Sequence, residues 1–223
     1  MTYLARQWYE KQTLAESALS NLTRVVTTVS QQARQPEIFA HVQPHARASA
    51  KLTRYFAATL FKGKGCKPTL KEIEFGAHMH DLGKYFITSS VLLKRGPLDK
   101  EERALVSLHP VYGATIVSKF PGTTDAIRGV VLHHHERWDG EGYPDGLART
   151  AIPFAARIVS VVDVYTSLRS KRSYKESFSK AKALAEIELM ASRQLDPLLV
   201  EDFLRFMEGR RSQSSCDRRD EIY

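Results

Sequence analysis

The stretch "LHHHERWDGEGYPDGL" at residues 132–147 raises the first question about this chain. Three consecutive histidines run into acidic residues, a tryptophan and a glycine-rich loop. Imidazoles beside a flexible turn are typical of a metal site that faces a substrate loop, but they also occur in histidine-rich loops exposed to solvent. The residues elsewhere in the chain distinguish these two interpretations.

The composition indicates a globular protein with one sizeable core. The chain has 223 residues, of which 43% are hydrophobic, and this length suits one domain or one domain with a modest extension. No apolar stretch is long enough for a membrane span, and the first residues lack the apolar segment of a secretory signal. Two distant cysteines, Cys66 and Cys216, fit a reducing compartment. We therefore expect a cytoplasmic protein without membrane insertion.

The formal net charge is +8, from 33 Lys and Arg against 25 Asp and Glu. A basic surface favours an anionic partner, which can be a nucleic acid, a membrane face or a phosphorylated small molecule. Because no nucleic-acid-binding motif is recognisable, no DNA or RNA polymer is expected as a partner.

The spacing of apolar residues predicts an all-α fold. Residues 3–33 contain no Pro or Gly, and their apolar positions recur about every 3.5 residues, which predicts one long amphipathic helix with a narrow seam. That seam can pair two chains or pack on the chain's own core. Asp99 is a good N-cap for a helix from Lys100. Further helical regions are expected at 36–60, 69–86, 94–120, 121–135, 152–170, 179–194 and 196–209.

The segment "HMHDLGK" at residues 78–84 places a histidine and an aspartate side by side in an otherwise apolar helix. The carboxylate of Asp81 could bridge two cations while His80 binds one of them. Lys84 follows one turn after His80 and could neutralise a phosphate. The alternative is a buried ion pair with a purely structural role.

Five more polar residues lie next to apolar stretches of other predicted helices. Each has a structural alternative: a capping histidine, a solvated histidine, or an aspartate paired with Arg157. Together they indicate a metal centre, and imidazole and carboxylate without thiolate suit Mn, Fe or a similar divalent ion. The five residues are His45, His109, His134, His135 and Asp163.

The order and spacing of these motifs resemble the HD-GYP subgroup of the HD phosphohydrolase superfamily, whose members hydrolyse cyclic di-GMP in bacteria. The matching segments are "HDLGK", "HP" at 109–110, "HHERWDGEGYPDGL", "RIVSVVDVY", "RSYK" at 172–175 and "LDPLLVEDF" at 195–203. The resemblance covers roughly residues 45–206. It implies an HD-type helical bundle with the N-terminal amphipathic helix added to it.

The resemblance also implies a catalytic centre with two divalent metal ions, most typically Fe or Mn. One ion would be held by His45, His80, Asp81 and Asp163, and the other by Asp81, His109, His134 and His135. Asp81 and Lys84 would be the catalytic residues, and a hydroxide bridging the two ions would attack the phosphate. The product would be linear pGpG, with further hydrolysis to GMP left open.

Residues around the centre would bind the substrate. By resemblance, Arg172 and Lys175 would hold phosphate groups, and Tyr143 and Pro144 of the Gly-Tyr-Pro loop would line the site. The same loop is a candidate contact for a diguanylate-cyclase-type protein. Glu136 is expected to orient a ligating histidine, His133 to lie behind the ligands or in solvent, and Trp138 to pack in the core.

The chain departs from the family pattern at the position of a third metal ligand. Where some relatives have a glutamate one turn before the first histidine, this chain has His41, and Pro44 is expected to break the turn that would align His41 with His45. His41 is therefore only a possible third-metal ligand, and two metals are expected. The competing function is a non-catalytic signalling module that binds a cyclic dinucleotide or a protein through the Gly-Tyr-Pro loop.

Three regions are predicted along the chain. Residues 1–35 form the N-terminal helix, which is a dimer contact or a signalling helix. Residues 36–209 form the HD-GYP catalytic domain, and residues 210–223 form a basic tail without a core-forming pattern. A homodimer through the N-terminal helix is one consequence of this division.

Overall fold

The computed structural model describes residues 36–61, 68–170 and 177–209. The predicted N-terminal helix and basic tail lie outside the described residues, as do Cys66, Cys216, Arg172 and Lys175. None of the described helices has the length and apolar character that crossing a bilayer requires.

The described residues form helices, turns and loops, and the prediction of an all-α fold is confirmed. An isolated bridge between Ala191 and Leu195 is the one β-type pairing among them. The α-helices are α2 (Pro36–Leu60), α3 (Leu70–Met79), α4 (Ser89–Leu92), α5 (Lys100–Val106), α6 (His109–Val117), α7 (Asp125–His133), α8 (Phe154–Arg169), α9 (Lys180–Leu189) and α10 (Pro197–Met207). Two short 3-10 helices are η1 (Leu82–Phe86) and η2 (Arg149–Ala151).

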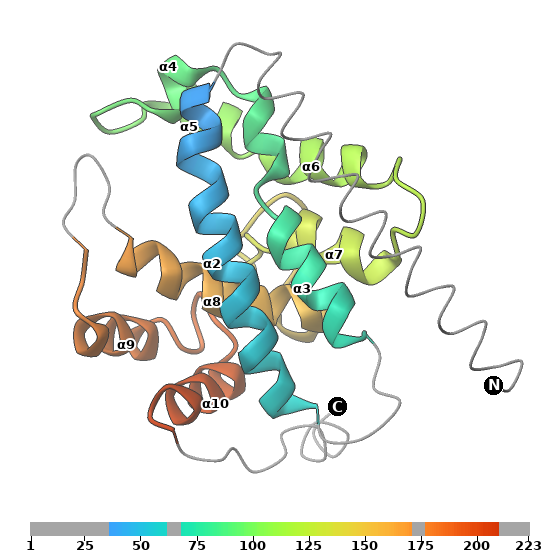
Figure 1. The fold of residues 1–223 in the computed structure, drawn as a ribbon. Helices are drawn as coiled ribbons and strands as arrows, with labels where there is room; N and C mark the ends of the chain where they lie inside the picture. The colour runs from blue at the N-terminus through green and yellow to red at the C-terminus, as the bar shows by residue number, and fades with distance from the viewer. Residues whose placement is uncertain (1–35, 62–67, 171–176, 210–223) are drawn as a thin grey trace, which may run out of the picture.

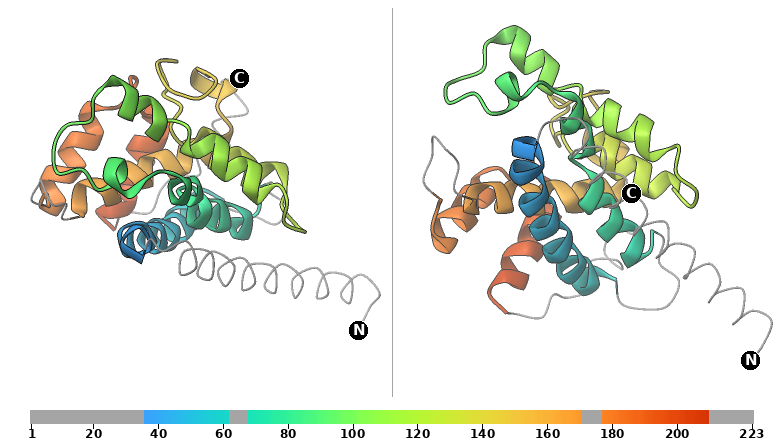
Figure 2. Two further views of the ribbon diagram at one scale, coloured as in Figure 1. Left: turned by 90° about the horizontal axis from the view of Figure 1, so that it is seen from above. Right: turned by 45° about the horizontal axis from the view of Figure 1, so that its top comes forward.

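The long helix α2 runs through the middle of the molecule and packs against α3 and α8 (Figure 1). On one side, α9 and α10 pack against α8. On the other side, α6 and α7 pack against each other, and α7 also packs against α3 and α8 (Figure 2). Helices α2 and α8 therefore lie between the α9–α10 side and the α6–α7 side of the molecule.

Two apolar clusters hold this arrangement together. The larger cluster joins α2, α3, α7, α8, α9 and α10, and it includes the edge-to-face ring pair Phe56 and Phe203, whose centroids are 5.1 Å apart. The smaller cluster joins α3, η1, α6 and α7. Met79 and Leu82 belong to the smaller cluster and flank His80 and Asp81 in the chain. Their burial therefore fixes the position of the His-Asp pair.

Several helix boundaries agree with the sequence and others do not, among them a break at Ser107 and Leu108 that divides the region predicted over 94–120 into α5 and α6. As predicted, α5 begins at Lys100, and Asp99 forms a capping box with Glu102. The single helix predicted over 69–86 is wrong, because α3 ends at Met79 and the chain continues as the tighter helix η1.

The expected break at Pro44 is also wrong. Helix α2 continues through Pro44, and His45 lies in its middle rather than at its start. Pro44 is exposed, so its ring lies on the solvent side of the helix. The neighbouring Val42 and Ala46 are buried in the protein interior, and this packing offsets the backbone hydrogen bond that a proline removes.

Candidate metal centre

Five parts of the fold bring the seven predicted ligands together. His45 comes from the middle of α2, His80 and Asp81 from the end of α3, and Asp163 from α8. The remaining three are His109 at the start of α6, and His134 and His135 at the end of α7. Their donor atoms form two groups, each within 4.8 Å: Asp81 with His109, His134 and His135, and Asp81 with His45 and His80. Asp81 is common to both groups.

Asp163 lies beside two histidines of the second group. Its Oδ1 atom lies 2.7 Å from Nε2 of His45 and 3.5 Å from Nε2 of His80. The structural alternative, a pair between Asp163 and Arg157, is wrong, because Arg157 instead donates to Asp196 at 2.7 Å. Asp163 is thus directed at the histidines and not at a structural cation.

Three of the histidines are oriented in the same way by the backbone. Nδ1 of His80 lies 2.7 Å from the Ala77 carbonyl, and Nδ1 of His109 lies 2.7 Å from the Val106 carbonyl. Nδ1 of His134 lies 3.0 Å from the carbonyl three residues before it. Because a carbonyl only accepts, each Nδ1 carries a proton and each ring directs its Nε2 atom at the centre.

Two of the inward-facing ligand atoms have no hydrogen-bond partner in the described part of the chain. Nε2 of His109 and Nε2 of His134 are 3.3 Å apart, although neither carries a proton in these tautomers. Nε2 of His80 and Oδ1 of Asp81 are fully buried without a hydrogen-bond partner in the described part of the chain. Buried polar atoms without partners are costly, and a metal ion bound by Nε2 of His80 and Oδ1 of Asp81 would satisfy both. The donor set therefore fits a divalent metal.

The charges around the centre also favour a cation. Burial lowers the pKa of His109 to about 3, with a further lowering by Lys84. Burial likewise lowers the pKa of His135 to about 3. Although burial opposes it, the charges of Asp81 and Asp163 raise the pKa of His80 to about 10. The two outer histidines are thus neutral ligands at neutral pH, and the position between the two carboxylates stabilises a positive charge.

Lys84 reaches the shared carboxylate. Its Nζ donates to Oδ2 of Asp81 at 2.7 Å, and its side chain is 23% exposed. Although burial favours the protonated acid, His80 and Lys84 hold the pKa of Asp81 well below its usual range. Lys84 therefore borders the centre from a position that an anionic ligand can still reach.

The glycine-rich loop folds directly onto the histidine pair. The ring of Tyr143 stacks on His135 with centroids 4.9 Å apart, and the Tyr143 N–H donates to the His135 carbonyl at 3.3 Å. Gly142 is required by close approach, because a Cβ there would lie 2.4 Å from the Arg137 nitrogen. The loop thus forms one wall beside the candidate ligands.

Glu136 has a different role from the expected one. Its buried carboxylate accepts the N–H of Asp145 at 2.7 Å and the N–H of Leu147 at 3.0 Å. The expectation that it orients a ligating histidine is wrong: its closest histidine nitrogen is Nδ1 of His133, at 3.8 Å. Glu136 holds the glycine-rich loop against the end of α7 instead.

Three other residues considered from the sequence lie outside the two donor groups that share Asp81. His41 is exposed on α2 and belongs to neither group of donors. The ring of Trp138 is partly buried and lies 5.8 Å from the Arg157 guanidinium carbon. His133 is outside both groups that share Asp81.

Sequence reasoning did not single out Ser160. Its buried hydroxyl donates to the His134 carbonyl at 2.6 Å and so ties the end of α7 to α8. The sequence feature that could have identified Ser160 is its position one turn before Asp163, as a hydroxyl residue in an otherwise apolar helix.

Comparison with known proteins identifies related sequences. A family model described as "HD domain" matches residues 9–199. The chain is 43% identical over 134 residues to a cyclic di-GMP phosphodiesterase response regulator of Xanthomonas campestris, covering 60% of this chain and 35% of that protein. It is 38% identical over 197 residues to a cyclic di-GMP phosphodiesterase of Vibrio cholerae, covering 83% of this chain and 40% of that protein.

A third relative carries a different name. The chain is 32% identical over 171 residues to a 3'3'-cGAMP-specific phosphodiesterase of Vibrio cholerae, covering 76% of this chain and 31% of that protein. The chain thus spans well under half the length of the curated relatives it matches.

Among solved structures, an HDG"Y"P protein from Bdellovibrio bacteriovorus has a similar fold. The TM-score is 0.62 at 18% sequence identity, and the match covers 90% of this chain and 70% of that one. This similarity supports the helical architecture of the chain.

Proposed function

The chain belongs to the HD domain family, and from this premise we propose that it is a metal-dependent phosphodiesterase that hydrolyses cyclic di-GMP to linear pGpG. The observation that carries the proposal is the shared position of Asp81. One buried carboxylate stands between two groups of donors, and this is the arrangement that a two-metal phosphodiesterase needs. The names of the relatives from Xanthomonas campestris and Vibrio cholerae support the class of substrate.

Under this proposal each donor group holds one metal ion, and Asp81 contributes to both. His45, His80, Asp81 and Asp163 would hold one ion, and Asp81, His109, His134 and His135 the other. Two divalent ions bound there would provide a nucleophile at neutral pH and neutralise charge on the phosphodiester. Fe and Mn are the ions we propose, because the donors are imidazole and carboxylate without thiolate.

The other residues would position and neutralise the substrate. Lys84 lies at hydrogen-bonding distance from Asp81 and would place a positive charge beside the scissile phosphate. Tyr143 and Pro144 belong to the loop that Glu136 holds against α7. Arg172 and Lys175, which lie outside the described residues, would bind the phosphates of the dinucleotide.

Two protein contacts remain part of the proposal. The amphipathic pattern of residues 3–33 supports a homodimer through that segment. The Gly-Tyr-Pro loop is the proposed contact for a diguanylate-cyclase-type partner. The competing role as a non-catalytic binding module is less well supported, because each predicted ligand in the described part of the chain is present and directed at the centre.

The test is turnover of cyclic di-GMP by protein purified without chelator and loaded anaerobically with Fe(II) or Mn(II). Products are separated by chromatography, and metal content is measured on the same samples. Asp81→Asn and His80→Ala should abolish product formation because both remove a proposed ligand. Asp125→Asn is the matched control, since Asp125 is exposed in the first turn of α7 and lies in neither donor group.

Linear pGpG from the parent and from the Asp125→Asn variant, but not from the ligand variants, is the expected result. Cyclic GMP-AMP is run in parallel, because one relative is named for that substrate. Turnover of cyclic GMP-AMP without turnover of cyclic di-GMP would show that the proposed substrate is wrong and that cyclic GMP-AMP takes its place. Two bound metals without turnover of either dinucleotide would contradict the phosphodiesterase function.

A further inference from the structure

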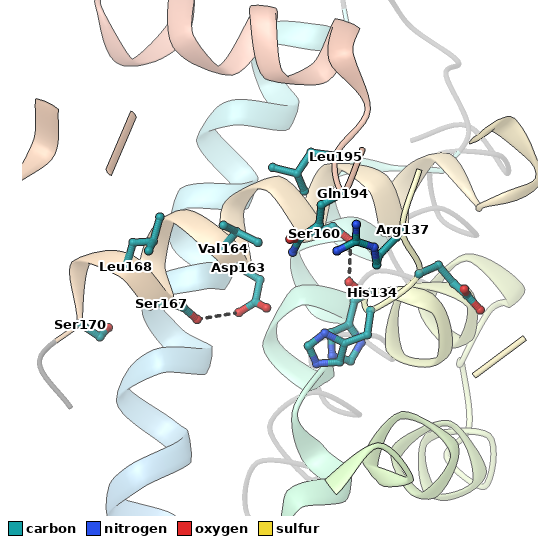
Figure 3. A pocket seen from close by; sticks show the side chains of 12 residues that line it. His134, Arg137, Ser160, Asp163, Val164, Ser167, Leu168, Ser170, Gln194 and Leu195 are labelled. Atoms are coloured by element: carbon teal, nitrogen blue, oxygen red, sulfur yellow. Dashed lines mark hydrogen bonds between the residues drawn. The ribbon is translucent and has the colours of Figure 1, made fainter. Parts of the chain in front are cut away.

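A cavity of about 350 Å³ lies beside the candidate metal centre. It follows α8, and its side chains are drawn in Figure 3. Near the metal centre it is lined by His134, His135 and Asp163, and farther along α8 by Ser167 and Ser170. A molecule in this cavity would therefore lie next to anything bound at the candidate ligands.

The walls suit a flat, partly polar ring. Val164, Leu168 and Leu195 provide apolar surface, and the other nine lining residues are polar or charged. Small-molecule sites have volumes of about 300 to 1,000 Å³. At the lower end of that range the cavity would admit one base of a dinucleotide but not the whole molecule.

Gln194 supplies an unused polar group at a fixed place. Its backbone carbonyl accepts the N–H of Trp138 at 3.1 Å, and its backbone N–H donates to the Met190 carbonyl at 3.0 Å. Both backbone groups are therefore occupied and hold the residue in position. Its half-buried side chain lines the cavity, and within the described part of the chain its amide makes no hydrogen bond.

The neighbouring cation is less free to recognise a base. Arg137 also lines the cavity, but its guanidinium is engaged with both carboxylate oxygens of Asp139. An unengaged amide offers an acceptor and a donor in one plane. That pattern complements the O6 and N1–H of guanine, and it also complements the N6 amino group and N7 of adenine.

We propose that this cavity is a purine subsite and that Gln194 recognises the edge of the base. The inference rests on the proposed phosphodiester chemistry, because a base here directs its phosphate toward His134, His135 and Asp163. Since the amide complements both purines, the subsite accepts guanine and adenine. Gln194 is thus a specificity-determining residue, and a carboxylate in its place favours guanine, whose N1–H and N2–H both donate.

The experiment measures the contribution of the base separately from turnover of a cyclic dinucleotide. The metal-loaded protein is assayed with bis(p-nitrophenyl) phosphate as the reporter substrate, and GMP, AMP and ribose 5-phosphate are compared as competitive inhibitors. In the parent, GMP and AMP should each inhibit about tenfold more strongly than ribose 5-phosphate, the equivalent of one or two hydrogen bonds. Gln194→Leu, which is similar in size, should remove most of this difference. Arg193→Lys, at an exposed neighbour that does not line the cavity, should retain it.

Gln194→Glu is the second variant. GMP should inhibit this variant well, whereas AMP should inhibit it poorly. Metal content and melting temperature are compared for all variants, and calorimetric binding of GMP replaces inhibition for any protein that does not hydrolyse the reporter.

Equal binding of GMP and ribose 5-phosphate by the parent would overturn the subsite. An unchanged difference between these two inhibitors in Gln194→Leu would also overturn it. A purine preference without turnover of cyclic di-GMP would contradict the proposed substrate and leave the subsite standing. Turnover of cyclic di-GMP without a purine preference would overturn the subsite and leave the proposed substrate standing.

Discussion

At the scale of single residues, a backbone carbonyl decides how each of three histidines can act. The carbonyls of Ala77, Val106 and Val131 hold the Nδ1 protons of His80, His109 and His134. With Nδ1 held by a carbonyl, Nε2 is the nitrogen of each ring that would bind a metal. These rings are therefore oriented for metal binding before any ion arrives.

Adjacent histidines at the end of α7 allow a direct test of this assignment. His134→Ala should lower the metal content of the purified protein, because it removes an inward-facing Nε2 atom. His133→Ala should retain both ions, because His133 lies outside the donor groups that share Asp81. Metal content is measured by plasma mass spectrometry on protein of verified fold. Equal loss of metal in the two variants would mean that the substitutions act through the end of α7 and not through ligation.

The identity of these residues was predictable from the sequence, but their orientation was not. His45, His109 and Asp163 stand out because polar side chains are costly beside apolar stretches. The partner of Asp163 was open at that stage, since Arg157 was an equally reasonable neighbour. The choice depends on α8 packing against α2, which brings His45 to 2.7 Å from Asp163. Such a contact across 118 positions of the chain has no local signal.

At the scale of elements, Gly83 determines how η1 meets α6. A Cβ at Gly83 would lie 1.9 Å from the His109 carbonyl oxygen and 2.8 Å from the Gly113 nitrogen. Both are backbone atoms, so no side chain can rotate to make room. The glycine of the "HDLGK" segment therefore allows the His-Asp turn to lie directly against the helix that begins with His109.

Gly83→Ala should consequently separate η1 from α6 and weaken the metal centre. We expect a loss of about 2 kcal/mol or more in the free energy of unfolding, together with reduced metal content. Gly96→Ala is the matched control, because a Cβ at Gly96 would meet nothing within 4 Å. Its effect should stay within about 0.5 kcal/mol. Denaturant titrations monitored by circular dichroism give both values, and similar stability of the two variants would refute the close-packing argument.

The helices themselves were largely readable from the sequence, and the exceptions have physical causes. Capping residues such as Asp99 mark where helices begin. The end of α3 at Met79 was missed because "HMHDLGKYF" continues the helical pattern of apolar residues. The tight helix η1 follows from the approach of Gly83 to α6, a tertiary contact. The continuity of α2 through Pro44 is likewise set by the packing of its buried face.

At the scale of the whole molecule, the candidate metal centre lies where α2, α3, α6, α7 and α8 converge (Figure 1). The buried Asp81 and the partly buried Asp163 are concentrated there. Without a metal they depend on histidines and Lys84 for compensation. A cation that binds the folded chain and not the unfolded one stabilises the fold as a whole. Metal occupancy and global stability are therefore expected to change together.

Removal of metal should thus lower the melting temperature of the entire domain. An ion present at 100 times its dissociation constant adds roughly 2.7 kcal/mol of stability, which corresponds to roughly 5–10 °C for a domain of this size. Calorimetric scans before and after EDTA treatment, and after restoration of Mn(II), should show a loss and a recovery of that order. The Asp81→Asn variant should melt at the same temperature with and without EDTA, because it lacks the carboxylate shared by both donor groups. A parent protein that contains metal and yet melts identically after chelation would show that the ions bind outside the convergence of these helices.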